Sequence, residues 1–441
     1  MKYDKFFALA KEAGITDCEL SFTTSTSLEI SLFHGEISNY SSNSSSSYLA
    51  RGIYKGKMGS ITSDVYNKDS AELFVKKIIE NASVIENDDP VFIFKGSEKY
   101  RKINTFNKDL GKISPEIKLN KLYELEKKIR ELDPRIIEVE AVGYEESSST
   151  STILNSHGLK LTQKNNNYVY YGASVAKEGE QVKTGFDLFL DNDFNKFNVD
   201  ELAKSVVKES TSKLGGHQCA SATYKAVLSQ DVVKSFMSAY ISSAVAEDVQ
   251  KNSSLFVGKL GQKVASRKVT IEDKPLAKTI FAKGFDDEGV ATKNLTIVKN
   301  GTLQSYLYNL TTAAKDKVES TGHGVVGGGS KVGTTTWYLE MKAGKKSLDE
   351  LCKEVDNGVY ITEVSGLHAG LNPRSGNFSL LSTGFMIENG KITHGLDIIT
   401  VSGNLVELFN SITEVGSDSK EFASAIKCPS VIVKKIAVSG K

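Results

Sequence analysis

Apolar residues along the chain follow two different periods, and together they predict an α+β fold. Helical spacing of apolar residues runs from Tyr3 to Ala13, where Gly14 ends it, and returns in Asp69–Ile85. It appears again from Pro115, which follows the capping residue Ser114, and in Val199–Leu214. Between these segments the period changes to two, which is typical of strands.

The predicted strands lie in three regions of alternating polar and apolar residues. They are Glu19–Phe33, the flanks of the serine-rich segment Ser41–Ser47, and most of Ile136–Leu190. The serine-rich segment is either a flexible linker or a polar-faced strand, and the alternation of its flanks favours the strand. Within the third region, the polar run Asn165–Asn167 predicts a turn.

The glycine pair Gly215–Gly216 marks the predicted boundary between two domains. Residues 1–215 form an N-terminal domain of mixed helices and β-hairpins, and residues 222–441 form a predominantly antiparallel β domain with a few helices. Two helices are predicted in the second domain, Asp231–Val249 and Asn404–Val415. A chain of 441 residues is long enough to bury two separate cores.

Composition excludes several classes of protein. Lys+Arg 55 and Asp+Glu 54 nearly cancel, whereas a nucleic-acid-binding protein usually carries a basic excess. No run of about 18 apolar residues predicts a membrane span, and the N-terminus lacks the apolar core of a signal peptide. The cysteines are scattered without a CxxC pair, as expected for reduced thiols. We therefore expect a cytoplasmic protein that binds neither membranes nor, as a primary role, nucleic acid.

Residues that could carry metal, phosphate or nucleophilic chemistry form no complete motif. The histidines are dispersed, with no HExxH pattern. Gly322–Gly327 matches GxGxxG, but a helix-like segment precedes it and a β-like segment follows, the inverse of a dinucleotide site. A plain turn and a loop that a ligand approaches remain alternatives there. The acidic run Asp286–Glu288 is interpreted as a solvated turn.

Three spaced stretches resemble the TldD/PmbA family, also called modulator of DNA gyrase, and its PmbA (TldE) branch most. They are GQKVAS at 261–266, GFDDEGVATKNLTIVKNGTLQSYLYN at 284–309, and GLNPRSGNFSLLSTGFMIENGKI at 370–392 followed by GNLVELFNSITEVGSD. The N-terminal ARGIYKGKMGS also fits the family pattern, so the resemblance covers essentially the whole chain.

The resemblance implies a two-subunit cytoplasmic metalloprotease whose TldD-type subunit carries zinc on an HExxxH helix and a distant cysteine. Counting back from Gly261 without gaps places Met237 and Ser242 at the two histidine positions and Ser238 at the glutamate. Thioether and hydroxyl groups are poor zinc ligands, and Cys428 lies beyond the position expected for the cysteine. We therefore expect that this chain binds no metal or other cofactor, and that zinc is held only by a TldD-type partner.

The resemblance also implies a function, which is to pair with a TldD-type subunit in the maturation or degradation of unfolded, extended peptides. A sheet edge could hold such a peptide through main-chain hydrogen bonds. The candidate peptide-binding residues are His323, Arg374, Asn377, Ser379 and Ser382. Three alternatives remain: an independently active peptidase, a regulator that binds DNA gyrase, and a self-sufficient homodimer.

Overall fold

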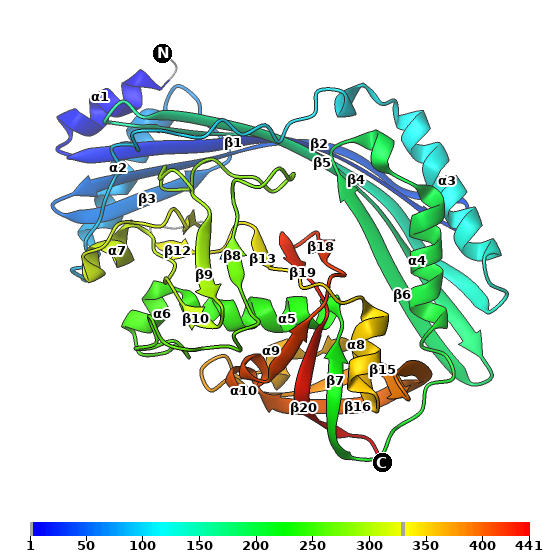
Figure 1. Ribbon diagram of the computed structural model, residues 1–441. Helices are drawn as coiled ribbons and strands as arrows, with labels where there is room; N and C mark the ends of the chain where they lie inside the picture. The colour runs from blue at the N-terminus through cyan, green and yellow to red at the C-terminus, as the bar shows by residue number, and fades with distance from the viewer. Residues whose placement is uncertain (1–2, 328–330) are drawn as a thin grey trace.

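The computed structural model describes residues 3–327 and 331–441. Its largest element is one long antiparallel sheet (Figure 1). Its six strands have the order β3-β2-β1-β4-β5-β6. Their bounds are β1 Asp17–Phe33, β2 Glu36–Tyr54, β3 Lys57–Ser63, β4 Ile136–Asn155, β5 Lys160–Glu178 and β6 Gln181–Asp191. The serine-rich segment lies within β2, which confirms the strand. The turn predicted at Asn165–Asn167 is wrong, because these residues pair with Ser147–Ser149 inside the sheet.

Two pairs of helices cover one face of this sheet at its two ends (Figure 1). Helices α1 (Asp4–Glu12) and α2 (Ser70–Ser83) share a core with Leu20 near the start of β1. Helices α3 (Pro115–Glu131) and α4 (Val199–Thr211) share a second core with Ile30 near its end. Leu20 and Ile30 are an even number of residues apart, so both helix pairs lie on the same, outer face of the sheet.

The C-terminal half is built mainly from two further six-stranded sheets, with the orders β16-β15-β14-β7-β20-β17 and β10-β9-β8-β13-β19-β18. In the first, β16 also pairs with β20, which closes the sheet on itself. Its strands are β7 Ala222–Leu228, β14 Gly358–Ser365, β15 Asn377–Glu388, β16 Lys391–Asn404, β17 Ile412–Val415 and β20 Val431–Ser439. The second sheet contains β8 Ile271–Asp273, β9 Leu295–Lys299, β10 Thr302–Leu303, β13 Leu339–Met341, β18 Lys420–Phe422 and β19 Ile426–Cys428.

Helices and a small hairpin complete this half. They are α5 Gln230–Ile241, α6 Ala246–Gln250, α7 Leu310–Asp316, α8 Leu348–Val355, α9 Leu367–Gly370, α10 Leu405–Asn410, and the hairpin of β11 Gly324–Val326 and β12 Val332–Thr334. The fold is therefore α+β with a β-rich C-terminal half, as predicted. No helix in the described part of the chain has the length and apolar character needed to cross a bilayer.

Both predicted C-terminal helices are shorter than expected. The first ends at Ile241 and gives way to a 3₁₀ turn, Ser242–Ala244, before α6. The second ends at Asn410, and its last apolar residues form β17, which pairs with β20. Short apolar runs satisfy either period, so the sequence pattern alone could not separate these cases.

The contact between α4 and β6 gives a direct test of the fold. A Cβ added at Gly185 on β6 would lie 2.4 Å from the Ser210 nitrogen and 2.6 Å from the Val206 carbonyl oxygen of α4. We expect Gly185→Ala to lower the free energy of unfolding by about 1–3 kcal/mol, because the helix must move away from the strand. Urea unfolding measures this, and Gly111→Ala is the control, since no atom lies within 4 Å of its added Cβ. Equal stability of the two variants would contradict the packing described.

Candidate functional site

A cavity of about 490 Å³ lies between the inner face of the long sheet and segment 280–287 of the C-terminal half. The sheet side is built from residues that stand directly opposite one another on neighbouring strands and therefore share a face. One such row is Ser47, Thr23, Ser151 and Gln163. In the next row, Ser149 and Asn165 line the cavity. We call this space the sheet cavity.

Uncharged polar side chains line the sheet cavity together with apolar ones, which are Phe22, Leu49, Ile153, Ile280, Phe281, Ala282, Phe285 and Val326. The hydroxyl and amide residues that line it are Ser21, Thr23, Ser47, Thr62, Ser149, Ser151, Thr152, Gln163, Asn165 and Asn167. Some neighbours within a row are hydrogen-bonded to each other, such as Thr23 Oγ1 and Ser151 Oγ, which lie 2.9 Å apart. Hydroxyl and amide groups both donate and accept hydrogen bonds, so the wall can bind neutral polar groups in either sense.

The charged side chains that line the sheet cavity lie together at one place. Of its lining residues, only Lys283 and Asp287 are charged, and they form an ion pair of 2.7 Å. Lys283 Nζ also lies 3.7 Å from the centroid of the Trp337 ring, while Asp287 accepts a hydrogen bond from the Val326 amide at 3.2 Å. The pair is neutral overall, so it leaves the cavity without a strong preference for anions or cations.

The acidic turn beside the cavity is not solvated, and that prediction is wrong for Asp286 and Glu288, which are both buried. Asp286 accepts hydrogen bonds from the amides of Glu288, Val290 and Gly324 at 2.9–3.0 Å. Glu288 accepts one from the amide of Leu310, at the start of α7, at 2.9 Å. Burial raises the pKa of each carboxyl to about 7. The sequence gives no sign of this, because nothing in the run DDE distinguishes a buried turn from an exposed one.

A buried ion pair of the long sheet lies in the electrostatic field of this turn. Arg51 donates to Glu19 Oε1 from Nε at 3.2 Å and from Nη2 at 2.6 Å. Glu19 Oε2 and Arg51 Nη1 are buried and have no hydrogen-bond partner in the described structure. Burial raises the pKa of Glu19, with Arg51 opposing the rise. Burial likewise raises the pKa of Glu288, and the charge of Arg51 partly opposes that rise as well. Charges of the two halves are therefore coupled across the join.

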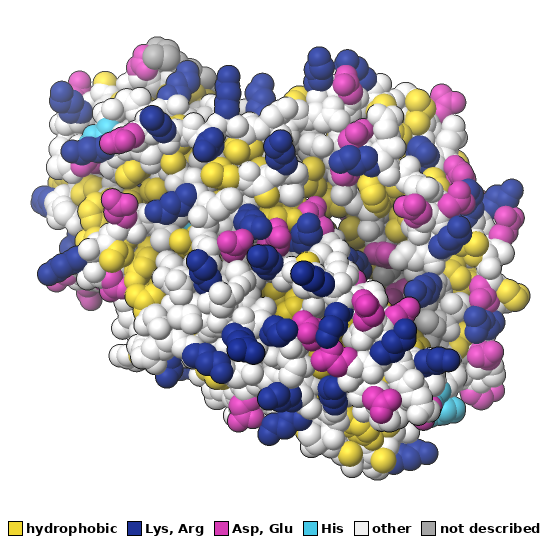
Figure 2. Space-filling model, in the orientation of Figure 1, with side chains coloured by type: hydrophobic (Ala, Val, Ile, Leu, Met, Phe, Trp, Pro, Cys, Tyr) yellow, Lys and Arg dark blue, Asp and Glu magenta, His cyan; other side chains and the backbone are white. Residues whose placement is uncertain are grey.

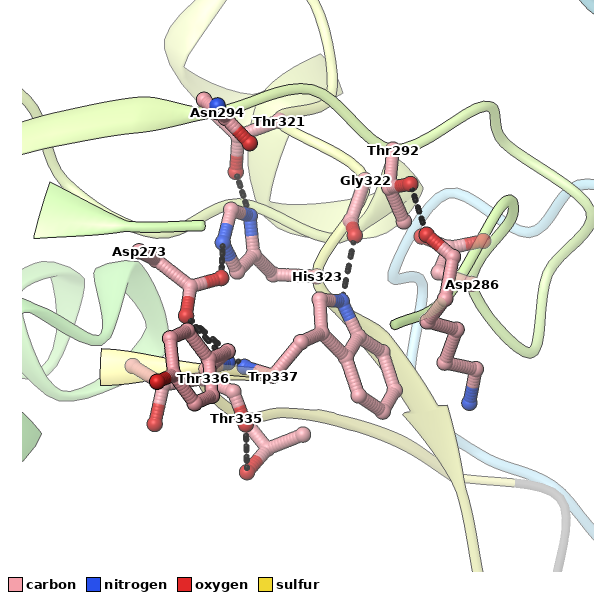
Figure 3. A network of polar contacts seen from close by, with 12 residues as sticks. Asp273, Asp286, Thr292, Asn294, Thr321, Gly322, His323, Thr335, Thr336 and Trp337 are labelled. Carbon is pink, nitrogen blue, oxygen red and sulfur yellow. Dashed lines mark hydrogen bonds and ion pairs between the residues drawn. The ribbon is translucent and has the colours of Figure 1, made fainter. Parts of the chain in front are cut away.

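His323 stands at the centre of a buried polar network (Figure 3). Its Nε2 lies 2.9 Å from Asp273 Oδ2, and its Nδ1 lies 2.8 Å from Thr321 Oγ1. Asp273 Oδ1 accepts from the amides of Trp337 and Tyr338 at 3.0 and 2.7 Å. Both imidazole nitrogens thus bind the protein itself. The GxGxxG segment continues into strand β11 and not into a helix, so it lacks the helix N-terminus that a dinucleotide site requires.

The residues aligned with the zinc motif do not fit a zinc ion. Met237 is fully buried in the core of the C-terminal half, whereas Ser238 and Ser242 are exposed, and the Ser242 hydroxyl donates to the Ala239 carbonyl at 2.8 Å. The thiol of Cys428 donates to the Gln230 carbonyl at 3.3 Å, and burial raises its pKa to about 12. Thioether, hydroxyl and neutral thiol groups are weak zinc ligands. Within residues 3–327 and 331–441, no three His, Cys, Asp or Glu side chains are arranged to hold a metal.

The remaining candidate peptide-binding residues separate into two sets. Arg374, Asn377 and Ser379 are exposed and line a surface hollow of about 580 Å³. Ser382 is buried, and its hydroxyl donates to the Leu380 carbonyl at 3.1 Å. The expected sheet edge is absent here among the described strands, because β15 lies between β14 and β16. The sequence analysis did not predict the sheet cavity. The serine and threonine runs of β1, β2 and β4 are the feature of the sequence that could have indicated it.

The chain matches three successive domains of one family. They are PmbA/TldA metallopeptidase domain 1 over residues 18–82, the central domain over residues 108–214, and the C-terminal domain over residues 221–440. This chain belongs to the PmbA/TldD family of metallopeptidases. The first two of these domains together contribute the strands of the long sheet, so the sheet cavity lies where all three family domains meet.

Individual relatives agree with this assignment. A protein of Buchnera aphidicola named metalloprotease PmbA homolog is 30% identical over 71% of this chain and 68% of its own length. A protein of the same organism named metalloprotease TldD homolog is 28% identical over 73% of this chain and 68% of its own length. A Thermotoga maritima protein described as a modulator of DNA gyrase is 31% identical to this chain in sequence. Its crystal structure superposes on this chain with a TM-score of 0.91, and the match covers 99% of each chain.

The raised pKa values of the acidic turn predict how stability depends on pH. Because the folded-state pKa of Glu288 is above its unfolded value, the folded chain binds more protons between about pH 4.5 and 7, and stability falls as pH rises through this window. In Glu288→Gln, the loss of unfolding free energy between pH 5 and 8 should be smaller than in the wild type by on the order of 3 kcal/mol. The measurement is urea unfolding at pH 5, 6, 7 and 8, with exposed Glu319→Gln as the control. A Glu288→Gln profile parallel to that of the wild type would refute the assignment.

Proposed function

We propose that this PmbA-like chain is a non-catalytic protease subunit that holds extended peptides in the sheet cavity and pairs with a TldD-type catalytic subunit. The observation that carries the proposal is the wall of that cavity, which offers hydroxyl and amide groups and one neutralised ion pair among apolar side chains. A peptide main chain presents an N–H donor and a C=O acceptor at nearly every residue. A wall of groups that donate and accept therefore suits main chain of any sequence.

The side chains of α5 and of the 3₁₀ turn that follows it support the non-catalytic part of the proposal. Zinc in a hydrolase is held by imidazole, carboxylate or thiolate groups, and Met237, Ser238 and Ser242 supply none of these. Cleavage then requires a second chain that carries the metal. A TldD homolog and a PmbA homolog both occur in Buchnera aphidicola among the relatives of this chain, as expected if the two types work together.

The other functions have less support. An independently active peptidase needs a nucleophile or activated water, and the buried carboxylates and His323 are held by the protein's own groups. A regulator of DNA gyrase is suggested by the description of the Thermotoga maritima protein, but no feature of the cavity favours it. The described cysteines are all free and buried, in keeping with a cytoplasmic location, where thiols stay reduced.

Mixing experiments test the pairing. Co-expression with the TldD-type protein of the same organism should give a stable complex that cleaves an unstructured peptide, and mutation of the partner's zinc-binding histidines should abolish cleavage. The measurements are size-exclusion chromatography and peptide hydrolysis with each subunit alone and with both. If this chain elutes alone and the partner cleaves equally well without it, the subunit assignment is wrong. Cleavage by this chain alone would favour the independent peptidase.

A substitution in the cavity tests peptide binding separately. Ser151 lies on the inner face of β4 and Thr150 on the outer face. We expect Ser151→Leu to weaken binding of a labelled unstructured peptide by tenfold or more, because the added side chain fills cavity space and removes a polar group. Thr150→Leu, the control, should bind as the wild type does. Fluorescence anisotropy measures both, and equal affinity of the two variants would remove the cavity from the proposal.

A further inference from the structure

The inner face of β5 changes character part-way along the strand. Its inward residues begin with the amides Gln163, Asn165 and Asn167, all of which line the sheet cavity. The next inward positions of the same strand are apolar, namely Val169, Tyr171, Ala173 and Val175. All seven side chains are partly exposed, whereas the outward residues from Asn166 to Ala176 are buried. The apolar inward side chains therefore form an accessible surface and not part of the core.

Strand β6 extends this apolar surface. Leu190, Leu188 and Phe186 stand opposite Val169, Tyr171 and Ala173 in the register of the two strands, and Phe186 is 55% exposed. The rings of Phe186 and Tyr171 lie 6.1 Å apart at 34°. We call the inward side chains of Val169, Tyr171, Phe186, Leu188 and Leu190 the aromatic platform. Figure 2 shows a hollow between this half of the sheet and the C-terminal half.

The platform is a built feature, because a glycine makes room for it. A Cβ added at Gly143 on β4 would lie 2.1 Å from Tyr171 Cζ. Only glycine lets the tyrosine ring lie down across the neighbouring strand, where it forms a flat apolar floor beside Phe186. A ring needed solely for the core would face α3 and α4, as the buried rings of Tyr168 and Tyr170 do on the opposite face.

The platform is also next to an open strand edge. β6 is the outermost strand of the long sheet (Figure 1), and within the described structure its free edge pairs with no other strand. The amide of Leu188 is bonded to the Asp187 carboxylate at 2.8 Å instead of to a neighbouring strand. An extended chain that leaves the sheet cavity along β5 would reach the platform after about two residues, since alternate strand residues are roughly 6.8 Å apart.

We infer that the aromatic platform is a subsite for apolar side chains of an extended peptide whose main chain occupies the sheet cavity. This inference rests on the proposed function. Two features select that occupant: the platform continues the cavity wall on one strand, and its side chains repeat with the two-residue period of an extended peptide. Two carboxylates, Glu145 and Glu29, stand opposite each other at its border. The chain would then prefer unfolded segments that carry apolar residues at alternate positions.

Two peptides and one substitution test the subsite. A labelled 12-residue peptide with leucine at three alternate positions in a Gly/Ser background is compared with the same peptide carrying serine there. The wild type should bind the leucine peptide roughly tenfold more tightly, the gain expected from partly burying apolar side chains. Phe186→Ser should remove this advantage and leave the serine peptide unchanged, whereas Phe186→Tyr should retain it. Leu73→Ser, at a similarly exposed apolar site on α2, is the control.

The outcomes separate this subsite from the proposed function. If both peptides bind equally to the wild type, the subsite is refuted while peptide binding stands. If neither peptide binds, the proposed function fails and the subsite with it. If the chain instead forms dimers in analytical ultracentrifugation that Phe186→Ser dissociates, the platform is a self-association surface and the inference is overturned. Because Phe186 is more than half exposed, its replacement should leave folding intact, and a thermal melt checks this.

Discussion

The length of the sheet strands is the constraint on which the rest of this structure depends. β1, β2, β4 and β5 have 17, 19, 20 and 19 residues, and about 3.3 Å per residue makes each of them roughly 55–65 Å long. The helices that cover the sheet have 9 to 17 residues, or about 14–26 Å at 1.5 Å per residue. One helix layer cannot cover such a sheet, so separate pairs cover its two ends. The middle is left to serine, threonine and asparagine, which tolerate both sheet pairing and contact with water.

The middle of the sheet is mostly uncharged and contacts water, whereas the join between the two halves buries charged side chains. Taking an ion pair such as Glu19 and Arg51 out of water is unfavourable unless its hydrogen bonds are satisfied, and one atom of each side chain has no partner in the described structure. The acidic turn offsets part of this deficit by placing Glu288 in the field of Arg51. The same turn binds β11 through Asp286 and reaches the cavity through Asp287.

The sequence predicted local elements better than the long-range contacts that make the site. The period of two identified the strands, including the serine-rich one, because alternation survives even when one face is polar. It could not show that Ser41–Ser47 and Ser147–Ser151 flank the same part of β1, or that Asn165–Asn167 pair with Ser147–Ser149, since pairing register depends on the whole sheet. Asp286 and Glu288 were misjudged for the same reason. Their surroundings include Gly324, which lies more than thirty residues away in sequence and contacts both side chains.

The two parts of the inner sheet face would contribute differently to binding. Each hydrogen bond from the polar wall replaces one to water and is worth only about 0.5–1.5 kcal/mol net, and it is nearly the same for every peptide because the main chain is constant. An apolar side chain that is partly buried on the aromatic platform gains only a fraction of the about 1.5–3 kcal/mol that full burial gives, but that gain varies with the residue. Under the proposed function, the wall would favour extended chains in general, while the platform would determine which of them dissociate most slowly. Such a subunit would in this way influence which peptides a catalytic partner receives, without holding a metal itself.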